Sequence, residues 1–289
     1  MQAPEVQRAV AAAISIAKTL GLQVDDAIVL QNSNKLALRL LPCDALARVA
    51  PLAHQVAQFE IELAGRLAET ESPAVALEPR VPPRVYERDG FAVTLWTYYA
   101  SVTPDLAPAD YANALSCLHI GMRKIEITTP HFTDRVEEAA QLVANQDQTP
   151  ELADVDRALL SGMLKDLRKK IVDLGAAEQL LHGEPHPGNV LSTKIGPLFI
   201  DLETCCRGPI EFDLAHVPEA VIEHYPDVDQ PLLSECRALV LAMLAAWRWD
   251  RDDQFPNGQQ WAQHFIHTLR KGPPWPSLHA LARQLEGPG

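Results

Sequence analysis

His182-Gly183-Glu184-Pro185-His186-Pro187-Gly188-Asn189 is the stretch that decides how this chain of 289 residues is interpreted, and Ile200-Asp201-Leu202-Glu203 completes it. The first stretch is a loop of polar and turn-forming residues. Two short apolar runs follow it, joined by a turn-like segment at 192–197, and together they predict a β-hairpin. Asn189 and Asp201 then lie at neighbouring ends of the hairpin, where an amide oxygen and a carboxylate could converge.

Amide and carboxylate oxygens in this order suit a hard cation. Mg²⁺ takes one or two carboxylates, keeps several waters and completes its coordination from phosphate oxygens. Glu184, five residues before Asn189, is placed to orient a hydroxyl or to accept its proton. A carboxylate, an asparagine five residues later and an aspartate beyond a hairpin follow one another in the same order in kinases.

These motifs, with Gly208-Pro209-Ile210-Glu211-Phe212-Asp213-Leu214-Ala215 after them, resemble the aminoglycoside phosphotransferase family, whose loop usually reads His-Gly-Asp-x-x-x-x-Asn. The resemblance implies a protein-kinase-like fold, ATP and Mg²⁺ as cofactors, Asn189 and Asp201 as metal ligands, and Glu184 as the base. Glu184 stands where the family has an aspartate. The additional methylene can move the carboxylate by roughly 1 Å, and such a displacement can cost on the order of 100-fold in rate.

The rest of the sequence predicts an α+β protein with two lobes. Hydrophobic periodicity indicates helices at 5–20 and 55–70, strands at 27–30, 36–41 and 45–50, and a hairpin at 84–87 and 91–96. It also indicates later helices at 108–124, 133–145, 151–174, 216–224 and 230–249. With the resemblance, we expect a small antiparallel β N-lobe at 1–96 and a larger, mainly helical C-lobe at 97–289, with a hinge near 96–100.

The resemblance assigns nucleotide-binding roles to residues of the N-lobe. The first hairpin turn of the family covers the phosphates, and here that turn lacks glycine. The phosphate-binding lysine of the family's third strand corresponds to Arg48, which keeps a permanent charge. We expect Arg48 to pair with Glu60, with Glu62 as the competitor. The remaining candidates for nucleotide contact are Ser33 and Asn34 in the turn, and Trp96, Thr97 and Tyr98 at the hinge.

A different metal site is also conceivable in the same loop. His182, Glu184 and His186 could bind zinc in a metal-dependent hydrolase. The intervening prolines disfavour this interpretation, because they break the helix that zinc-enzyme motifs use. We expect instead that His182 holds the loop by hydrogen bonds, that Asp213 anchors it by accepting backbone N–H bonds, and that His119 packs in the core.

Candidate acceptor-binding residues lie later in the chain. Trp247 and Asp250 belong to an aromatic and acidic cluster after a long apolar helix, and they would suit an ammonium group. A solvated helix end with local ion pairs is the alternative. Glu203 could bind the acceptor or a second metal ion, or it could pair with an arginine such as Arg207.

The charge balance argues against some partners. The net charge is −13, with 38 acidic and 25 basic residues, which disfavours nucleic acid or an anionic membrane and is compatible with a cationic acceptor. Five cysteines without a CxxC pair, and an N-terminus without an apolar signal segment, indicate reduced thiols in the cytoplasm. The sequence leaves open whether the protein is a monomer or a dimer.

The sequence thus predicts an ATP-dependent phosphotransferase that moves the γ-phosphoryl group to a hydroxyl of a small molecule. An aminoglycoside-like antibiotic, with antibiotic resistance as the role, or an amino-alcohol metabolite would be the acceptor. The alternative is a nucleotide-binding protein of kinase fold with little or no transferase activity. Glu184, Arg48 and the turn without glycine favour that alternative.

Overall fold

The computed structural model of the chain describes residues 1–52, 56–102 and 106–286. Their contacts divide the chain into two compact units. The first contains Met1–Leu106, Ile120–Ile127 and Val190–Glu203, and the second contains Ala107–His119, Thr128–Asn189 and Thr204–Gly289. Each unit therefore collects segments from several parts of the chain. The predicted lobe boundary at residues 96–100 stays a prediction.

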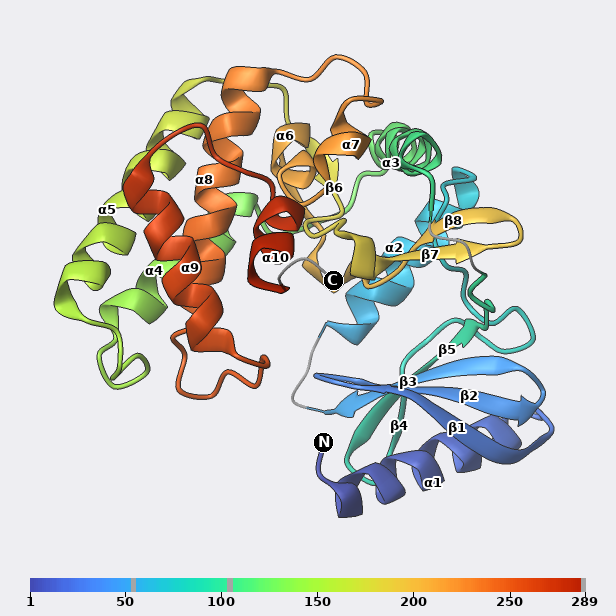
Figure 1. Cartoon of the computed structure of the whole chain (residues 1–289). Helices are drawn as coiled ribbons and strands as arrows, with labels where there is room; N and C mark the ends of the chain where they lie inside the picture. The colour runs from blue at the N-terminus through green and yellow to red at the C-terminus, as the bar shows by residue number, and fades with distance from the viewer. Residues whose placement is uncertain (53–55, 103–105, 287–289) are drawn as a thin grey trace. The chain divides into compact units, whose positions relative to one another are not determined.

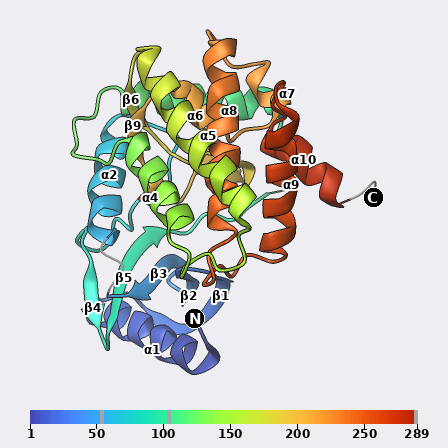
Figure 2. The ribbon, with the colours of Figure 1, turned by 90° about the vertical axis from the view of Figure 1, so that its left-hand side faces the viewer.

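The first unit is built on an antiparallel sheet of five strands in the order β1-β2-β3-β5-β4 (Figure 1). The strands are β1 (Val24–Asn32), β2 (Leu36–Pro42), β3 (Ala45–Pro51), β4 (Tyr86–Arg88) and β5 (Phe91–Thr97). Alternate residues of β2 and β3 are buried, as the period-two pattern predicts. Helix α1 (Ala3–Thr19) packs its alanine-rich face against the side of the sheet on which these residues are buried, and Figure 2 shows it next to the sheet.

A second helix and a small hairpin complete the first unit. The helix is α2 (Ala57–Glu69), and the hairpin consists of β7 (Val190–Thr193) and β8 (Gly196–Phe199). The backbone of Phe199 donates to the carbonyl of Pro73 at 2.8 Å and accepts from the N–H of Val75 at 3.0 Å. These bonds tie the hairpin to the segment that follows α2. The predicted hairpin is therefore confirmed, and it belongs to the unit of the first sheet although it comes far later in the chain.

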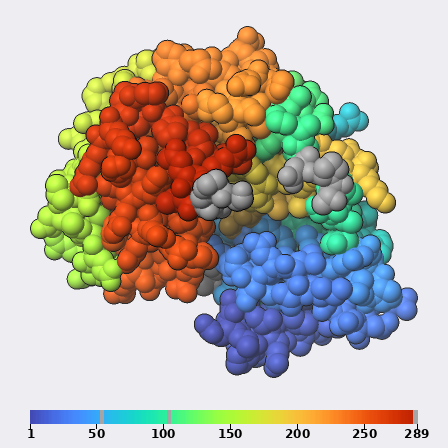
Figure 3. All heavy atoms as spheres, in the orientation of Figure 1, coloured from blue at the N-terminus to red at the C-terminus, as the bar shows by residue number. Residues whose placement is uncertain are grey.

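The second unit is mainly helical. Helix α8 (Gln230–Trp247) contacts α4 (Phe132–Ala144), α5 (Asp154–Asp173), α6 (Ile210–Leu214) and α9 (Gly258–Lys271). Strand β6 (Gln179–Leu181) pairs antiparallel with β9 (Cys206–Gly208) and leads into the 182–189 loop. The unit also contains α7 (Glu219–Ile222) and α10 (Leu278–Glu286), and Figure 3 shows α9 and α10 forming much of its visible surface. Helix α3 (Pro108–Met122) begins in this unit and ends in a segment of the first.

The predicted fold class, an antiparallel sheet followed by a mainly helical region, is confirmed. Most predicted elements are present with ends that differ by a few residues; residue 55, at the predicted start of the second helix, lies outside the described residues. Helices α9 and α10 were not predicted, because polar residues and prolines dominate the sequence after residue 249. Phe265 and Leu269, buried one turn apart in α9, carried the missed signal. Within the described ranges, no helix is long and apolar enough to cross a bilayer.

Candidate active site

Two basic side chains and one glutamate form a buried ion-pair arrangement in the first unit. Arg48 on β3 donates from Nη1 to one carboxylate oxygen of Glu60 at 2.7 Å, and Glu60 on α2 is only 2% exposed. Lys35, just before β2, donates to the other carboxylate oxygen at 2.5 Å. The predicted pairing of Arg48 with Glu60 is confirmed. The competitor Glu62 instead pairs with Arg66, on the same helix, at 2.7 Å.

Two further carboxylates join the same side chains. Asp201 accepts a hydrogen bond from Arg48 Nη2 at 2.5 Å and lies 4.0 Å from Lys35 Nζ. Glu203 lies 2.6 Å from Lys35 Nζ, so its partner is a lysine and not the arginine that the sequence suggested. Lys35, Arg48, Glu60, Asp201 and Glu203 together form the charge cluster of the first unit.

The charge cluster sets three carboxylates against two cations. Burial lowers the pKa of Arg48, but Glu60 and Asp201 more than offset this effect and the pKa is raised. The side chains of Asp201 and Glu203 are 31% and 22% exposed, whereas that of Glu60 is 3% exposed. Solvent therefore reaches two carboxylates that share the excess negative charge. Such a donor set fits Mg²⁺, which prefers one or two carboxylates.

Asp201 has an uncommon backbone conformation. Its φ angle is +62°, in the left-handed region that aspartate and asparagine tolerate better than most residues with a side chain. Holding a residue there costs on the order of 1 kcal/mol. The conformation directs the carboxylate to Arg48, so the backbone and the ion pair together fix the position of the predicted metal ligand.

Asp213 anchors the 182–189 loop of the second unit. Its buried carboxylate accepts the backbone N–H groups of His182 at 2.9 Å and Gly183 at 2.7 Å, and His119 Nε2 lies 2.9 Å away. Burial raises the pKa of Asp213, but the hydrogen bond and charge of His119 outweigh this and the pKa is lowered. The predicted anchoring role of Asp213 and the predicted packing of His119 in the core are confirmed. His182 is also buried, and its Nδ1 accepts the N–H of Glu184 at 3.4 Å.

Gly183 is required at its position by both conformation and space. Its φ angle is +89°, and a Cβ there would lie 2.0 Å from the carbonyl oxygen of Thr204. Thr204 also donates its hydroxyl to the carbonyl of His182 at 3.1 Å. The close approach of these backbones fixes the point at which the 182–189 loop turns before Glu184.

Glu184 is ion-paired with Arg135, which projects from α4. Arg135 also donates to the carbonyl of Gly183 at 3.4 Å, and its guanidinium carbon lies 5.1 Å from the centre of the Trp247 ring. Burial raises the pKa of Glu184, but the charge of Arg135 outweighs this effect and the pKa is lowered. The predicted base is therefore a carboxylate at neutral pH, with its position fixed by an arginine.

Asn189 ends the loop in a short 3-10 turn, η1 (Pro187–Asn189). Its Nδ2 donates to the carbonyl of Glu184 at 3.0 Å, so its side-chain oxygen is the atom that it can offer to a cation. That Asn189 and Asp201 bind one cation stays a prediction. Across the described residues, no three His, Cys, Asp or Glu side chains are grouped as a metal site requires. The alternative zinc site of His182, Glu184 and His186 is therefore wrong.

Phosphate contact by Ser33 and Asn34 in the first turn stays a prediction. Ser33 and Asn34 are exposed in the turn before β2. The backbone N–H of Ser33 donates to the carbonyl of Lys35 at 3.1 Å, so this donor is already used. Contact with a phosphate through Ser33 would therefore involve its hydroxyl.

At the predicted hinge, several polar groups are engaged within the first unit. Trp96 is 1% exposed, and its indole N–H donates to Thr94 at 2.8 Å. The N–H of Thr97 donates to the carbonyl of Ala76 at 2.9 Å, and the ring of Tyr98 carries an arginine guanidinium at 4.2 Å. Adenine recognition by this segment stays a prediction, and it would have to use other backbone groups.

The predicted acceptor-binding residues after α8 interact with the protein's own groups. The ring of Trp247 faces Arg135. Asp250 accepts the backbone N–H of the residue two positions later at 3.0 Å, and Asp253 pairs with Arg248 at 2.9 Å. The segment thus has the local ion pairs and turns of the alternative interpretation, and an acceptor-binding role for Trp247 and Asp250 stays a prediction.

His216 lies in the second unit and carries no charge at neutral pH. It is 5% exposed, its ring meets that of Phe212 edge to face, and its Nε2 has no hydrogen-bond partner among the residues that the structure describes. Burial lowers its pKa to about 4, and the charge of Glu184 only partly opposes this effect. His216 is therefore a neutral, desolvated side chain in the interior of the second unit.

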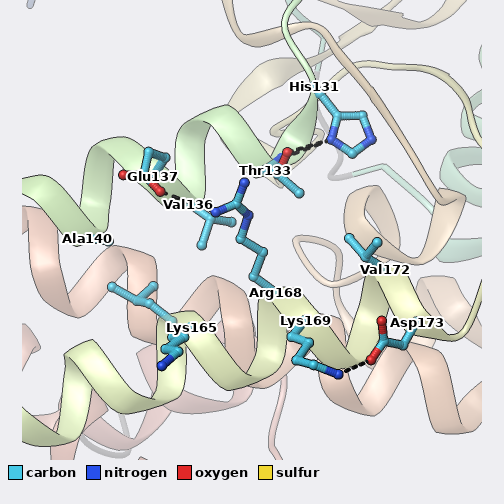
Figure 4. A pocket seen from close by; sticks show the side chains of 11 residues that line it. His131, Thr133, Val136, Glu137, Ala140, Lys165, Arg168, Lys169, Val172 and Asp173 are labelled. Carbon is cyan, nitrogen blue, oxygen red and sulfur yellow. Dashed lines mark hydrogen bonds and ion pairs between the residues drawn. The ribbon is translucent and has the colours of Figure 1, made fainter.

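A hollow of about 550 Å³ between α4 and α5 contains none of the predicted site residues. Figure 4 shows Arg168 of α5 extending toward Glu137 of α4. Arg168 pairs with Glu137 at 3.2 Å, and a neighbouring lysine pairs with an aspartate on α5. The hollow has walls of paired charges and apolar side chains, so it is not the candidate active site.

Lys35 and Arg135 are the residues that the sequence analysis missed. For Lys35 a signal existed: the sheet register sets Ala37 opposite Arg48, so Lys35, two residues away on the same face, is a diagonal neighbour of Arg48. For Arg135 no comparable signal existed. Its contact with Glu184 depends on how α4 packs near a loop that is distant in the sequence.

Comparison with known proteins agrees with this geometry. Residues 32–252 match the model of the phosphotransferase enzyme family, whereas no curated protein matches the chain significantly. Among solved structures, the amicoumacin kinase hAmiN in complex with AMP-PNP, Ca²⁺ and Ami has a TM-score of 0.71 at 11% identity, covering 95% of this chain and 98% of that chain. The choline kinase LicA from Streptococcus pneumoniae has a TM-score of 0.65 at 15% identity, with coverage of 89% and 98%.

A putative fructosamine-3-kinase from Haemophilus somnus 129PT has a TM-score of 0.67 at 11% identity, with coverage of 91% and 98%. At these identities the structures establish the fold, which is that of protein-kinase-like phosphotransferases. The matched residues 32–252 include the whole charge cluster and the 182–189 loop. The predicted resemblance is confirmed: the chain belongs to the phosphotransferase enzyme family and is a small-molecule phosphotransferase that acts on a hydroxyl group.

Proposed function

We propose that the protein transfers the γ-phosphoryl group of ATP to a hydroxyl of a small molecule in the presence of Mg²⁺. The observation that carries this proposal is the charge cluster of the first unit. Two fixed cations can bind phosphate oxygens, and two partly exposed carboxylates can bind a divalent cation. The family indicates the class of reaction, and the charge cluster contains groups that can bind phosphate and a divalent cation.

Lys35 and Arg48 would contact the phosphates, and Glu60 would hold both cations in position. Arg48 offers a planar fork that suits phosphate oxygens, whereas Lys35 acts as a compact point charge. Asp201 and Glu203, with Asn189, would hold Mg²⁺. When bound, Mg²⁺ would neutralise charge on the phosphate oxygens.

Glu184 would orient the acceptor hydroxyl and accept its proton. Its lowered pKa keeps it in the carboxylate form that this role needs. The side chain is one methylene longer than the family's aspartate, but Arg135 restricts where the carboxylate can lie. We therefore propose that Arg135 compensates for the greater length, because a mobile carboxylate would lose positioning and hence rate.

A second candidate function is nucleotide binding with little or no transfer. The same ion pair favours it, because Arg135 already occupies the carboxylate of Glu184. In that case Mg²⁺ and ATP would bind to the charge cluster, but a hydroxyl acceptor would not accelerate the formation of ADP. The two candidates thus make the same prediction for nucleotide binding and opposite predictions for turnover.

Thermal melting with Mg²⁺ and ATP tests the nucleotide site. At about 100 times Kd, binding should stabilise the folded protein by roughly 2.7 kcal/mol. Asp201→Asn should abolish the Mg²⁺-dependent part of this stabilisation, because it removes a charged metal ligand while keeping a side chain that tolerates positive φ. Asp25→Asn, an exposed site on β1, is the matched control. An unchanged melting temperature in the wild type with Mg²⁺ and ATP would exclude both candidates.

A further inference from the structure

The backbone that follows Glu184 is held by Tyr111, a residue of helix α3. The hydroxyl of Tyr111 donates to the carbonyl of Pro185. The side chain is buried, and burial, together with the charge of Asp213, raises the pKa of Tyr111, so the hydroxyl keeps its proton and acts as a donor. The residue after Glu184 therefore has its carbonyl group fixed by a buried side chain.

The backbone that precedes Glu184 is held by a second residue of α3, which acts through Asp213. One carboxylate oxygen of Asp213 accepts the N–H of Gly183 at 2.7 Å, and the other lies 2.9 Å from Nε2 of His119. His119 is fully buried and lies about two turns after Tyr111 on the same helix. Because a carboxylate only accepts hydrogen bonds, Nε2 of His119 is the donor to Asp213.

Tyr225 fixes the orientation of the His119 ring. Its hydroxyl lies 2.6 Å from Nδ1 of His119, and the two rings meet edge to face with their centroids 5.7 Å apart. In the neutral imidazole, Nε2 carries the proton that is donated to Asp213, so Nδ1 accepts from the hydroxyl of Tyr225. Each link of this buried chain thus has one donor and one acceptor, and a buried polar network that is fully bonded is rigid.

We propose that Tyr111 and His119 are positioning residues for Glu184. They fix the peptide groups on both sides of it, and hence the place from which its carboxylate extends, and Tyr225 supports them by orienting His119. This inference rests on the proposed function, in which Glu184 orients the acceptor hydroxyl. A glutamate has one more rotatable bond than the family's aspartate, so its carboxylate depends more strongly on a fixed backbone.

The titration of Glu184 tests the inference without an acceptor. In protein labelled with ¹³C at the glutamate carboxyl groups, NMR follows each group with pH, and the signal that is missing from Glu184→Gln identifies Glu184. In the wild type, burial raises the pKa of Glu184 but the charge of Arg135 outweighs it, so the pKa should lie below that of an ordinary glutamate. Tyr111→Phe should raise this pKa, because a loosened loop holds the carboxylate less firmly against Arg135.

Tyr86→Phe is the matched control. Tyr86 is also buried, and its hydroxyl also donates to a proline carbonyl, that of Pro82, at 2.6 Å, but it lies on β4 in the first unit. The two variants lose the same kind of bond, so their melting temperatures should fall to a similar extent. Only Tyr111→Phe should move the titration of Glu184. If neither variant moves it, Tyr111 has a structural role only and the inference is wrong.

Two further variants test the support through Asp213. His119→Gln removes the imidazole between Asp213 and Tyr225, and it should raise the pKa of Glu184. Tyr225→Phe keeps the ring and removes only the hydroxyl, so it should act in the same direction but to a smaller extent. The melting shift with Mg²⁺ and ATP should persist in both variants and would show that they are folded. An unchanged titration in folded His119→Gln would refute the positioning role of His119.

Turnover connects the position of Glu184 to the reaction. With ATP, Mg²⁺ and glycerol as an uncharged hydroxyl acceptor, the kcat for release of ADP should fall on the order of 10-fold in Tyr111→Phe, with KM for ATP unchanged. In Glu184→Gln the same replacement should have no further effect, because Tyr111 acts through the carboxylate. Losses that add in the double variant would contradict the inference.

The outcomes for the inference and for the proposed function are distinguishable. If ATP with Mg²⁺ does not shift the melting temperature of the wild type, the proposed function is wrong. The titration of Glu184 needs neither nucleotide nor acceptor, so it still decides whether the two α3 residues position this side chain. If nucleotide binds but none of the variants moves the titration, the inference is wrong and the proposed function stands.

Discussion

Lys35 is a buried lysine with several carboxylates around its ammonium group. Its ammonium group lies within 2.6 Å of both Glu60 and Glu203, and its side chain is only 9% exposed. A buried charge is tolerated only when it is well paired, and loss of one partner leaves the others uncompensated. Lys35 therefore joins Glu60 and Glu203, two carboxylates that no feature of the sequence places side by side.

Replacement of Lys35 should change the response to metal and to nucleotide in opposite directions. In Lys35→Met the cluster would have one cation against three carboxylates, so Mg²⁺ alone should stabilise the variant more than the wild type. The added stabilisation by ATP should fall, because a phosphate contact is lost. Melting with Mg²⁺ alone and with Mg²⁺ plus ATP measures both effects. Lys18→Met on the exposed side of α1 is the control, and equal responses to Mg²⁺ in both variants would contradict the prediction.

At the scale of single residues, the sequence predicted the roles that follow from helical spacing or from a short motif. Glu60 lies on the inward stripe of an amphipathic helix, and Asp213 belongs to a motif, so their partners could be named. Arg135 could not be identified, because its contact with Glu184 depends on tertiary packing that no sequence spacing reports. The structure therefore adds to the predicted base, Glu184, an ion-pair partner that the sequence could not name.

The 182–189 loop shows how a single element is fixed by buried polar groups. Asp213 holds the loop by two backbone hydrogen bonds, and His216, three residues later, is buried. In the folded state the pKa of His216 is about 4, whereas in the unfolded chain it should be near 6.5. The unfolded state therefore binds more protons between these two pH values.

This difference predicts a loss of stability in mild acid. The contribution of His216 is fully present above pH 6.5 and is lost as the pH falls toward 4, by roughly 3 kcal/mol in total. Urea unfolding at pH 7 and pH 4.5 should therefore show a larger loss in the wild type than in His216→Gln, which cannot titrate. The exposed His224→Gln is the control and should lose stability like the wild type. If His216→Gln shows the same loss, the buried histidine is not responsible.

Helices and strands were predicted well where their buried apolar residues recur at a regular spacing along the sequence. Strands β2 and β3 alternate between buried and less buried residues, and α2 and α8 have apolar residues at helical spacing, so these strands and helices were found. The short elements β6 and α6 were missed because three to five residues cannot show a period. Their positions are set by the loop and the long helices near them.

At the scale of the whole molecule, the chain passes several times between its two units. The first unit needs Ile120–Ile127 and Val190–Glu203 in addition to its N-terminal part. Sequence patterns assign each of these segments a local structure, but they do not report which unit a segment joins. A division at one point of the chain was therefore the simplest prediction that the sequence allowed.

This interleaving predicts cooperative unfolding. Each unit contains segments that are joined through the chain to segments of the other unit, so unfolding of one unit should destabilise the other. Calorimetry should therefore show one transition whose calorimetric and van't Hoff enthalpies agree. Mg²⁺ and ATP should raise the temperature of that single transition. Two transitions, of which nucleotide moves only one, would show that the units unfold independently.

The hairpin of β7 and β8 also limits how this enzyme can be recombined with its relatives. A chimera that exchanges only residues 1–106 would bring in foreign counterparts of Lys35, Arg48 and Glu60 but keep the native Asp201 and Glu203. The two halves of the charge cluster would then come from different parents. Working hybrids should therefore exchange Val190–Glu203 together with the N-terminal part, so that the gene must be crossed at more than one point.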